Sequence, residues 1–434
     1  MKIPPELDGL SKRDLIRIII SLQTKIEELE RRLLVYENSN TPPSKSNNRK
    51  YPEREHSNNP IGAPKKHEGT TRPYKEPDKV VDVKQETCNK CKHLLGNPIK
   101  IEKKIIEDIP EPQPIIVIQY NIHSYLCAWC AEINIAHNQE IPIKGRFGYN
   151  LIAEITSMKY EDRLPLRKIA DTLNRRHNLE ITSATVLDIL ERSADYCELT
   201  YDQIKIEIQK SRNVNADETG NPVQGKNWWT WVFTTPILVL FLITKSRGQK
   251  AILDILGKDF SGILNCDGWT SYPKCVKLIQ RCWAHLLREA KWYSEKYEGK
   301  SKLVYKELCR MFNRINKITV NTINGIRRRT YNYCSNKMTQ LIKACKRNRE
   351  LRKFAVKLEN GFQYWFTCIF NPYVEPTNNM AERALREIVV QRKIIGTLRN
   401  ERGTRIMQIL MSVLGTWKLQ RLNTYKMLLK TFRS

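Results

Sequence analysis

The sequence lacks any apolar run long enough to cross a membrane, and it is short of acidic residues. The longest apolar stretch, from Pro236 to Ile243, is far shorter than the ~20 residues that a transmembrane helix needs. Met1 to Pro5 lead into charged sequence rather than into the apolar segment of a cleavable signal. We therefore expect neither an integral membrane protein nor a secreted one, but a protein of the cytoplasm.

The shortage of acids leaves a large excess of positive charge. The 434 residues contain 74 Lys and Arg against 46 Asp and Glu, a net charge of +28. Such an excess favours a polyanionic partner, above all nucleic acid. With double-stranded DNA as that partner, the protein is expected at the nucleoid. A ribosomal or membrane-surface role would require a similar charge, so composition alone leaves those alternatives open.

Twelve cysteines in a reducing compartment are better explained as metal ligands and small core residues than as disulfides. Four of them form two Cys-x-x-Cys pairs, Cys88 with Cys91 and Cys127 with Cys130. Two such pairs can bind Zn²⁺ tetrahedrally through thiolates, which predicts a structural zinc module over residues 81–140. The Ile- and Val-rich stretch 105–122 is expected to form a β-ribbon between the pairs. Chance spacing of cysteines is the alternative.

Two further segments precede that module. Apolar residues in alternating steps of four and three predict a coiled coil over residues 11–37, and hence self-association of the chain. They are Leu15, Ile19, Leu22, Ile26, Leu29 and Leu33. An amphipathic helix docked on its own protein is the alternative. Residues 38–80, rich in Pro, Ser, Asn and Lys, are predicted to be a basic flexible linker.

Residues 150–198 show helical patterns at 151–160, 166–175 and 183–195. Thr182 or Ser183 can cap the third helix. This spacing predicts a helix-turn-helix domain whose third helix enters a groove of DNA, although generic three-helix packing would give the same pattern.

Residues 210–400 show the pattern of a ribonuclease-H-like α/β domain. Strands are expected at 212–217, 228–235, 238–244, 262–266 and 277–282, with a crossover helix at 249–256. In that order the first and fourth strands are neighbours, so Asp217 and Asp267, at their ends, should lie side by side. Glu382, on the first turn of a later helix, is the third expected ligand. Three carboxylates suit two Mg²⁺ or Mn²⁺ ions. A surface pair between Glu382 and Arg386 is the alternative.

Basic sequence surrounds these acids. A helical insertion is expected at about 299–372, and a basic helical tail over residues 401–434. The Lys and Arg residues of the insertion, and those after Glu382, are candidates for phosphate contacts. The DNA-binding candidates are Arg386, Arg392, Lys393, Arg399 and Arg402.

Several motifs together resemble the transposases of the insertion sequence 66 family. They are Asp217-Glu218-Thr219, Asp267-Gly268-Trp269 with Tyr272, Cys282-Trp283-Ala284-His285-Leu286-Leu287-Arg288, and Asn379-Met380-Ala381-Glu382-Arg383-Ala384-Leu385-Arg386 with Arg392-Lys393. The resemblance implies a DDE transposase with Asp217, Asp267 and Glu382 as its metal-binding triad. It also implies that His285 and Arg288 lie near the active site, where Asn379 and Arg383 are further candidates for support.

The expected protein is thus a multidomain α+β chain made of a coiled coil, a zinc ribbon-like module, a helix-turn-helix and a catalytic domain. The expected activity is binding of insertion-sequence ends, followed by metal-dependent DNA cleavage and strand transfer. The expected partners are transposon-end and target DNA, a second copy of the chain and accessory transposition proteins. The alternatives are a transposase-derived DNA-binding protein without catalysis and a nuclease that cuts without joining.

Overall fold

The computed structural model describes residues 11, 16, 18–26, 29, 76–297 and 299–433. The chain divides into two units, Met1–Gln113 and Pro114–Ser434, and each is described by itself. In the first unit residues 18–26 are helical, and Ile19, Leu22 and Ile26 are exposed there. Leu29 of the heptad pattern is also helical and exposed, whereas Leu15, Leu33 and linker residues 38–75 lie outside the described residues. The coiled coil remains a prediction.

Residues 105–122 differ from the expected β-ribbon. No strand is assigned to this stretch, which is described in full. Pro110, Pro112 and Pro114 lack the backbone N–H that a strand must donate, so the stretch cannot be one continuous strand, and its Ile- and Val-rich flanks find no strand to pair with. The short strands β1 (Ser124–Leu126) and β2 (Ile133–Ile135) instead pair antiparallel on either side of the second cysteine pair.

Helices α2 (Tyr149–Tyr160), α3 (Leu166–His177) and α4 (Ser183–Gln209) follow. Asn178, in the left-handed conformation, ends α3, and the hydroxyl of Thr182 caps α4 by accepting from the N–H of Thr185. Helix α4 continues far beyond the expected end at residue 195. Its buried stripe also continues, through Cys197, Tyr201, Ile204 and Ile208, and joins the core around the sheet.

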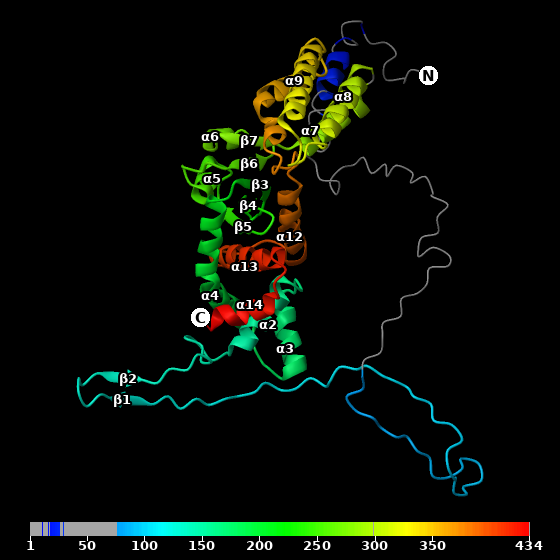
Figure 1. The fold of residues 1–434 in the computed structure, drawn as a ribbon, viewed down its shortest axis with the longest axis vertical. Coiled ribbons are helices and arrows are strands. Elements are labelled where there is room, and N and C mark those ends of the chain that lie inside the picture. Colours follow the sequence, from blue (N-terminus) through cyan, green and yellow to red (C-terminus); the bar gives the residue numbers. More distant parts are fainter. Residues whose placement is uncertain are drawn as a thin grey trace. The chain divides into compact units, whose positions relative to one another are not determined.

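The central sheet has the strand order β5-β4-β3-β6-β7 (Figure 1). Its strands are β3 (Asn213–Gly220), β4 (Trp229–Thr234), β5 (Val239–Thr244), β6 (Ile263–Cys266) and β7 (Leu278–Arg281). The first three run antiparallel, while β6 is parallel to β3 and β7 to β6. Helices α5 (Gln249–Leu256) and α6 (Tyr272–Cys275) connect them. This is the strand order and direction predicted from the sequence.

The stretch after β7 is helical, as expected of the insertion. After α7 (Trp283–Lys296) come α8 (Lys300–Ile315), α9 (Asn324–Lys346), α10 (Arg352–Asn360), a 3₁₀ turn η2 (Phe362–Tyr364) and α11 (Thr367–Phe370). These helices have a second apolar core of their own, around Trp283, Leu308, Met338, Phe354 and Trp365. Figure 1 shows α7, α8 and α9 at the end of the second unit away from α2 and α3.

The last helices are α12 (Asn379–Ile395), α13 (Glu401–Leu419) and α14 (Thr424–Phe432). Helix α13 belongs to the core rather than to a tail. Gln408, Ser412 and Thr416, one turn apart, accept from the N–H groups of Ile243, Phe241 and Val239. These groups lie on the outer edge of β5, so the side chains satisfy an edge that another strand could otherwise pair with. No helix of the described residues is long and apolar enough to be a membrane span.

Candidate active site

Asp217 lies on β3, and Asp267 directly follows the neighbouring strand β6. The parallel register of β3 and β6 pairs Asn215 with Asn265, and each aspartate stands two residues further along its own strand direction. Because side chains alternate along a strand, each aspartate shares a face with its asparagine. Asp267 directly follows β6, as expected, whereas Asp217 lies within β3 rather than at its end. Strand β3 runs on to Gly220 because it remains paired with β4.

The two aspartates have little to offset their charge. Asp217 accepts a hydrogen bond from the N–H of Glu218 at 2.9 Å, and Asp267 accepts one from the N–H of Trp269 at 2.8 Å. Burial raises the pKa of Asp217 well above its ordinary value. The carboxylates of Glu218, Asp267 and Glu382 raise it further, so Asp217 lies in the field of all three.

Glu382 is on the first turn of α12, with its side chain 29% exposed. It pairs with two residues of α7: His285 Nδ1 lies at 3.5 Å and Arg288 Nη2 at 3.8 Å. No ion pair joins it to Arg386, where both side chains are described. The sequence-based alternative of a Glu382–Arg386 surface pair is therefore not what this structure contains. We refer to Asp217, Asp267 and Glu382 as the carboxylate site.

Buried asparagines attach the start of α12 to the sheet. The amide of Asn378 donates to the carbonyl of Ala216 at 2.7 Å, and its oxygen accepts from Asn215 at 3.1 Å. Asn265 donates to the carbonyls of Glu375 and Thr377. The segment before α12 is thereby held against both aspartate-bearing strands, which fixes the helix that carries Glu382.

The sequence analysis did not predict this asparagine clamp, which consists of Asn215, Asn265 and Asn378. It named Asn379, which is exposed, as a support residue, whereas the neighbouring Asn378 is fully buried. A signal existed in the strands, because Asn215 and Asn265 are polar residues at positions whose neighbours predict burial on both sides. Their partners could not have been inferred, since they are distant in the sequence.

A second buried network explains other motif residues. The side chain of Glu218 is 1% exposed, and it accepts from Arg247 at 2.6 and 2.8 Å and from the hydroxyl of Tyr272 at 2.5 Å. The Arg247 guanidinium lies 3.9 Å from the ring centroid of Trp269. Burial raises the pKa of Glu218, as does Asp267, while Tyr272 and Arg247 lower it. Glu218 thus has a cationic partner, unlike the aspartate beside it.

The predicted DNA-binding cations fall into two groups. Arg386, Lys393 and Arg399 are exposed, as is Arg383. Arg392 donates to the carbonyl of Gly220, and Arg402 pairs at 2.6 Å with both Asp188 and Glu191 of α4. The second group is therefore already engaged within the protein.

Each cysteine pair forms the same tight turn. The N–H of Lys92 bonds to the carbonyl of Cys88, and that of Ala131 to the carbonyl of Cys127; both donors have positive φ. Backbone N–H groups within the turn lower the pKa of the Cys88 thiol and of the Cys127 thiol. Such turns favour thiolates, the form that binds metal. The two pairs belong to different units. Each turn is therefore suited to metal binding by its own geometry, and zinc binding by all four cysteines remains a prediction.

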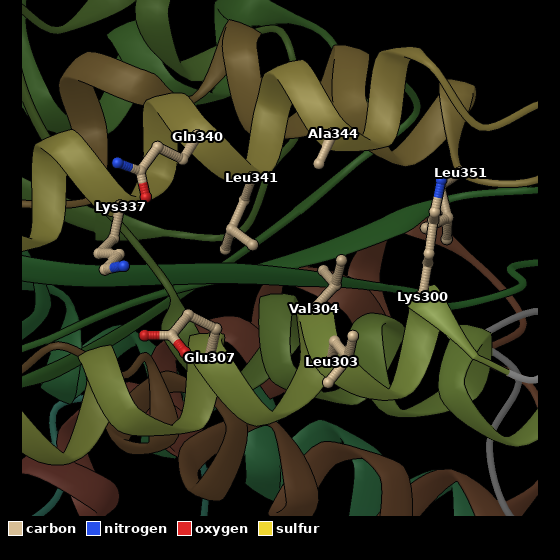
Figure 2. Close-up of a pocket in the computed structure, with 9 residues that line it drawn as sticks. All are labelled: Lys300, Leu303, Val304, Glu307, Lys337, Gln340, Leu341, Ala344 and Leu351. Carbon is tan, nitrogen blue, oxygen red and sulfur yellow. The ribbon is translucent and has the colours of Figure 1, made fainter.

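A surface groove lies elsewhere in the second unit. It has a volume of about 340 Å³ between α8 and α9, and none of the three site carboxylates lines it (Figure 2). Apolar Leu303, Val304 and Leu341 line it together with the charged Lys300, Lys337 and Glu307.

A family model described as "Transposase IS66 family" matches residues 144–406, more than half of the chain. The chain belongs to this transposase family. The matched range contains the whole carboxylate site, the α7 motif and the insertion, and it excludes both cysteine pairs. No curated protein matches the chain. The family assignment agrees with the resemblance drawn from the sequence motifs.

Proposed function

We propose that this protein is a DDE transposase that binds the ends of an insertion sequence and catalyses DNA cleavage and strand transfer. The observation that carries the proposal is the carboxylate site. Asp217 and Asp267, brought together by the β3–β6 register, have only backbone N–H groups as hydrogen-bond donors among the described residues. Glu382, held by the asparagine clamp, adds to the same field. Unneutralised carboxylates so arranged suit a cationic ligand.

The donor set fits Mg²⁺ or Mn²⁺, because both prefer hard carboxylate oxygens. Asp217, Asp267 and Glu382 would hold the ions. Two such ions, when bound, lower the pKa of an attacking water and stabilise a leaving 3′-oxygen. The protein's own residues bring the ligands together: the β3–β6 register aligns the aspartates, and Asn378 orients the helix of Glu382.

DNA contacts are proposed for the exposed basic surface. Arg386, Lys393 and Arg399 extend from α12 and the segment after it, and Arg175 and Arg176 are exposed on α3. Helix α4, expected to enter the groove, carries acids that pair with α13. We therefore assign phosphate contact in the helix-turn-helix to α3. Pairing of subunits by residues 11–37 and zinc binding by the four cysteines complete the proposal.

The deciding experiment uses labelled element-end DNA with Mg²⁺ or Mn²⁺. We expect nicked and joined products from the full chain, and about a 10²–10³-fold loss or more in Glu382→Gln, comparable with removal of one transition-state stabiliser. Glu387→Gln is the matched control, because it removes an exposed carboxylate of the same helix, and losing its pair with Arg163 should change stability by only roughly 0–1 kcal/mol.

The same assay separates the two rival functions. Nicked DNA without joined product would identify a nuclease, and binding without metal-dependent nicking would identify a DNA-binding derivative. Near-normal activity of Glu382→Gln would remove this residue from the site.

A further inference from the structure

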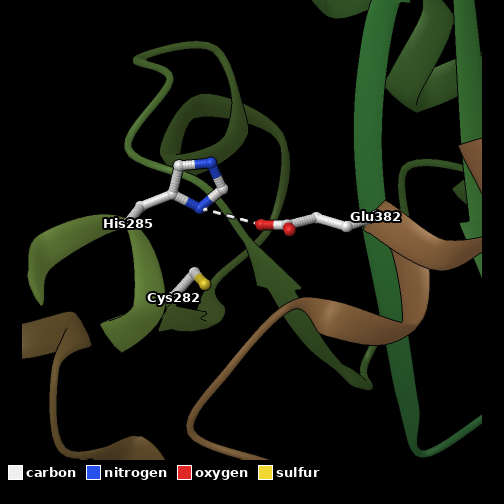
Figure 3. Close-up of side chains that lie close together, drawn as sticks. All are labelled: Cys282, His285 and Glu382. Carbon is white, nitrogen blue, oxygen red and sulfur yellow. Dashed lines mark ion pairs between the residues drawn. The ribbon is translucent and has the colours of Figure 1, made fainter. Parts of the chain in front are cut away.

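Glu382 belongs to a second cluster of potential metal ligands besides the carboxylate site. Cys282, His285 and Glu382 each offer one ligand atom, and these atoms all lie within 4.8 Å of one another. Figure 3 shows the imidazole and the carboxylate facing each other, with Cys282 beside them. Neither Asp217 nor Asp267 is part of this cluster. The carboxylate of Glu382 thus faces α7 in this structure.

Two atoms of the cluster are buried without a hydrogen bond. His285 Nδ1 and Glu382 Oε1 are 3.5 Å apart, yet neither has a hydrogen-bond partner in the described part of the chain. A buried polar atom without a partner is costly, and it calls for an explanation such as an ion between the two atoms. The separation is compatible with two ligands of one cation.

The local sequence builds the other side of the cluster. Cys282 is the N-cap of α7 and His285 lies three residues later, so both stand on the same side of the first turn. The Cys282 sulfur accepts from the N–H of Asn378 at 3.1 Å, which positions it beside α12.

We propose that Cys282, His285 and Glu382 form a binding site for a borderline-soft divalent cation such as Zn²⁺, distinct from the site for the catalytic ions. A thiolate and an imidazole suit Zn²⁺ rather than Mg²⁺, and three protein ligands leave a fourth position open. Because Glu382 is shared, an ion bound here keeps that carboxylate away from Asp217 and Asp267. Zn²⁺ at this site therefore inhibits DNA cleavage, a consequence that rests on the function proposed above.

The binding test uses Co²⁺ as a spectroscopic substitute for Zn²⁺ on the full chain. The chain is first given one equivalent of zinc, which the four thiolates of the cysteine module should take up in preference to the three-ligand cluster. We expect one further equivalent of Co²⁺ with a thiolate-to-cobalt charge-transfer band. Cys282→Ser should lose the band, and His285→Ala should weaken binding by at least about 10–100-fold, the usual cost of losing merely an outer-shell partner. Cys275→Ser, a half-buried cysteine outside the cluster, is the matched control and should retain the band.

Asp267→Asn distinguishes the two metal sites. It removes a catalytic ligand but no member of the cluster, so the band should persist. A band unchanged in Cys282→Ser would overturn the proposal, as would a band abolished by Asp267→Asn. If circular dichroism shows that Cys282→Ser is unfolded, the weakened Co²⁺ titration of His285→Ala decides in its place.

The inhibition test measures cleavage in excess Mg²⁺ with increasing Zn²⁺, each variant being normalised to its own zinc-free rate. The parent chain and Cys275→Ser should lose activity at lower Zn²⁺ than Cys282→Ser. Equal sensitivity of all three would overturn the inhibitory role. A chain that cuts no DNA at all would refute the proposed function, while the cobalt titration would still decide whether the site exists.

Discussion

Two groups of acids in this protein differ in what surrounds them. On α4, the acids Asp188, Glu191, Asp195 and Glu198 face Arg402 and Arg405 of α13, with contacts of 2.6–2.9 Å. In the carboxylate site, Asp217 and Asp267 accept only backbone N–H groups among the described residues, and burial raises the pKa of Asp217. The α4 acids are neutralised by their own fold, whereas the carboxylate site is not.

We propose that this difference separates structural acids from functional ones. Exposed ion pairs such as those of α4 contribute roughly 0–1 kcal/mol each, and they are readily made or lost. Buried carboxylates that repel one another oppose folding unless a cation joins them. Their retention in a folded protein is explained by a ligand or a reaction, here by the metal-dependent chemistry proposed for this transposase.

The largest loss of stability is expected from a substitution in the asparagine clamp. The clamp holds the carboxylate site together by hydrogen bonds between neutral groups, not by counter-charges. Asn378→Ala leaves the carbonyl of Ala216 and the amide of Asn215 unsatisfied and buried. We expect the free energy of unfolding to fall by about 2–4 kcal/mol and DNA cleavage to fall with it. Chemical denaturation measures the first and the nicking assay the second.

The neighbouring Asn379 is the matched control for this prediction, because it is exposed. Asn379→Ala should change stability by less than about 0.5 kcal/mol. Equal effects of the two variants would show that the clamp does not hold α12.

A second prediction compares one acid of the carboxylate site with one acid of α4. The pKa of Asp217 is raised in the folded state, so the stability that this group contributes is fully present below its unfolded pKa and is lost as pH rises through the folded pKa. Asp217→Asn, neutral at every pH, should therefore raise the melting temperature of the metal-free protein at pH 7, with the gain vanishing in acid. Asp195→Asn, which loses a pair with Arg405, should lower stability by roughly 0–1 kcal/mol.

Melting curves in a chelator at several pH values test these opposite signs. Added Mg²⁺ should narrow the gap between Asp217→Asn and the parent, since only the parent retains the full ligand set. A shift in the same direction for both variants would contradict the comparison.

The sequence predicted the parts of this site that depend on strand order. The order of the strands and the turns between them predicted three antiparallel strands, a crossover helix and a parallel return beside the first strand. That arrangement, which the structure has, brings Asp217 beside Asp267. The motif around Glu382 predicted the first turn of a helix, where the residue lies. These features follow from local pattern and from the fixed neighbours of strands within a sheet.

The remaining features depend on contacts between distant segments, which no local pattern contains. Arg247 follows β5 in an ordinary polar turn, and only the fold brings it to Glu218. Likewise Arg402 reads as one more cation of a basic segment until α13 is placed against α4. The expected ribbon at 105–122 failed for the opposite reason, because its residues favour strands but find no partner to pair with.

The smallest effect is expected where a predicted DNA contact is already engaged. Arg402→Ala removes the pairs with Asp188 and Glu191, and it should lower stability by at most about 1 kcal/mol while leaving DNA affinity nearly unchanged. Lys393→Ala, an exposed cation of α12, should weaken binding to all DNA sequences alike and reduce the slope of log affinity against log salt by about 1. Titrations of element-end DNA at several salt concentrations measure both. If Arg402→Ala reduced the salt slope as much as Lys393→Ala, its guanidinium would have to leave the acids of α4 when DNA binds, and pairing within the fold would no longer separate structural from DNA-binding cations.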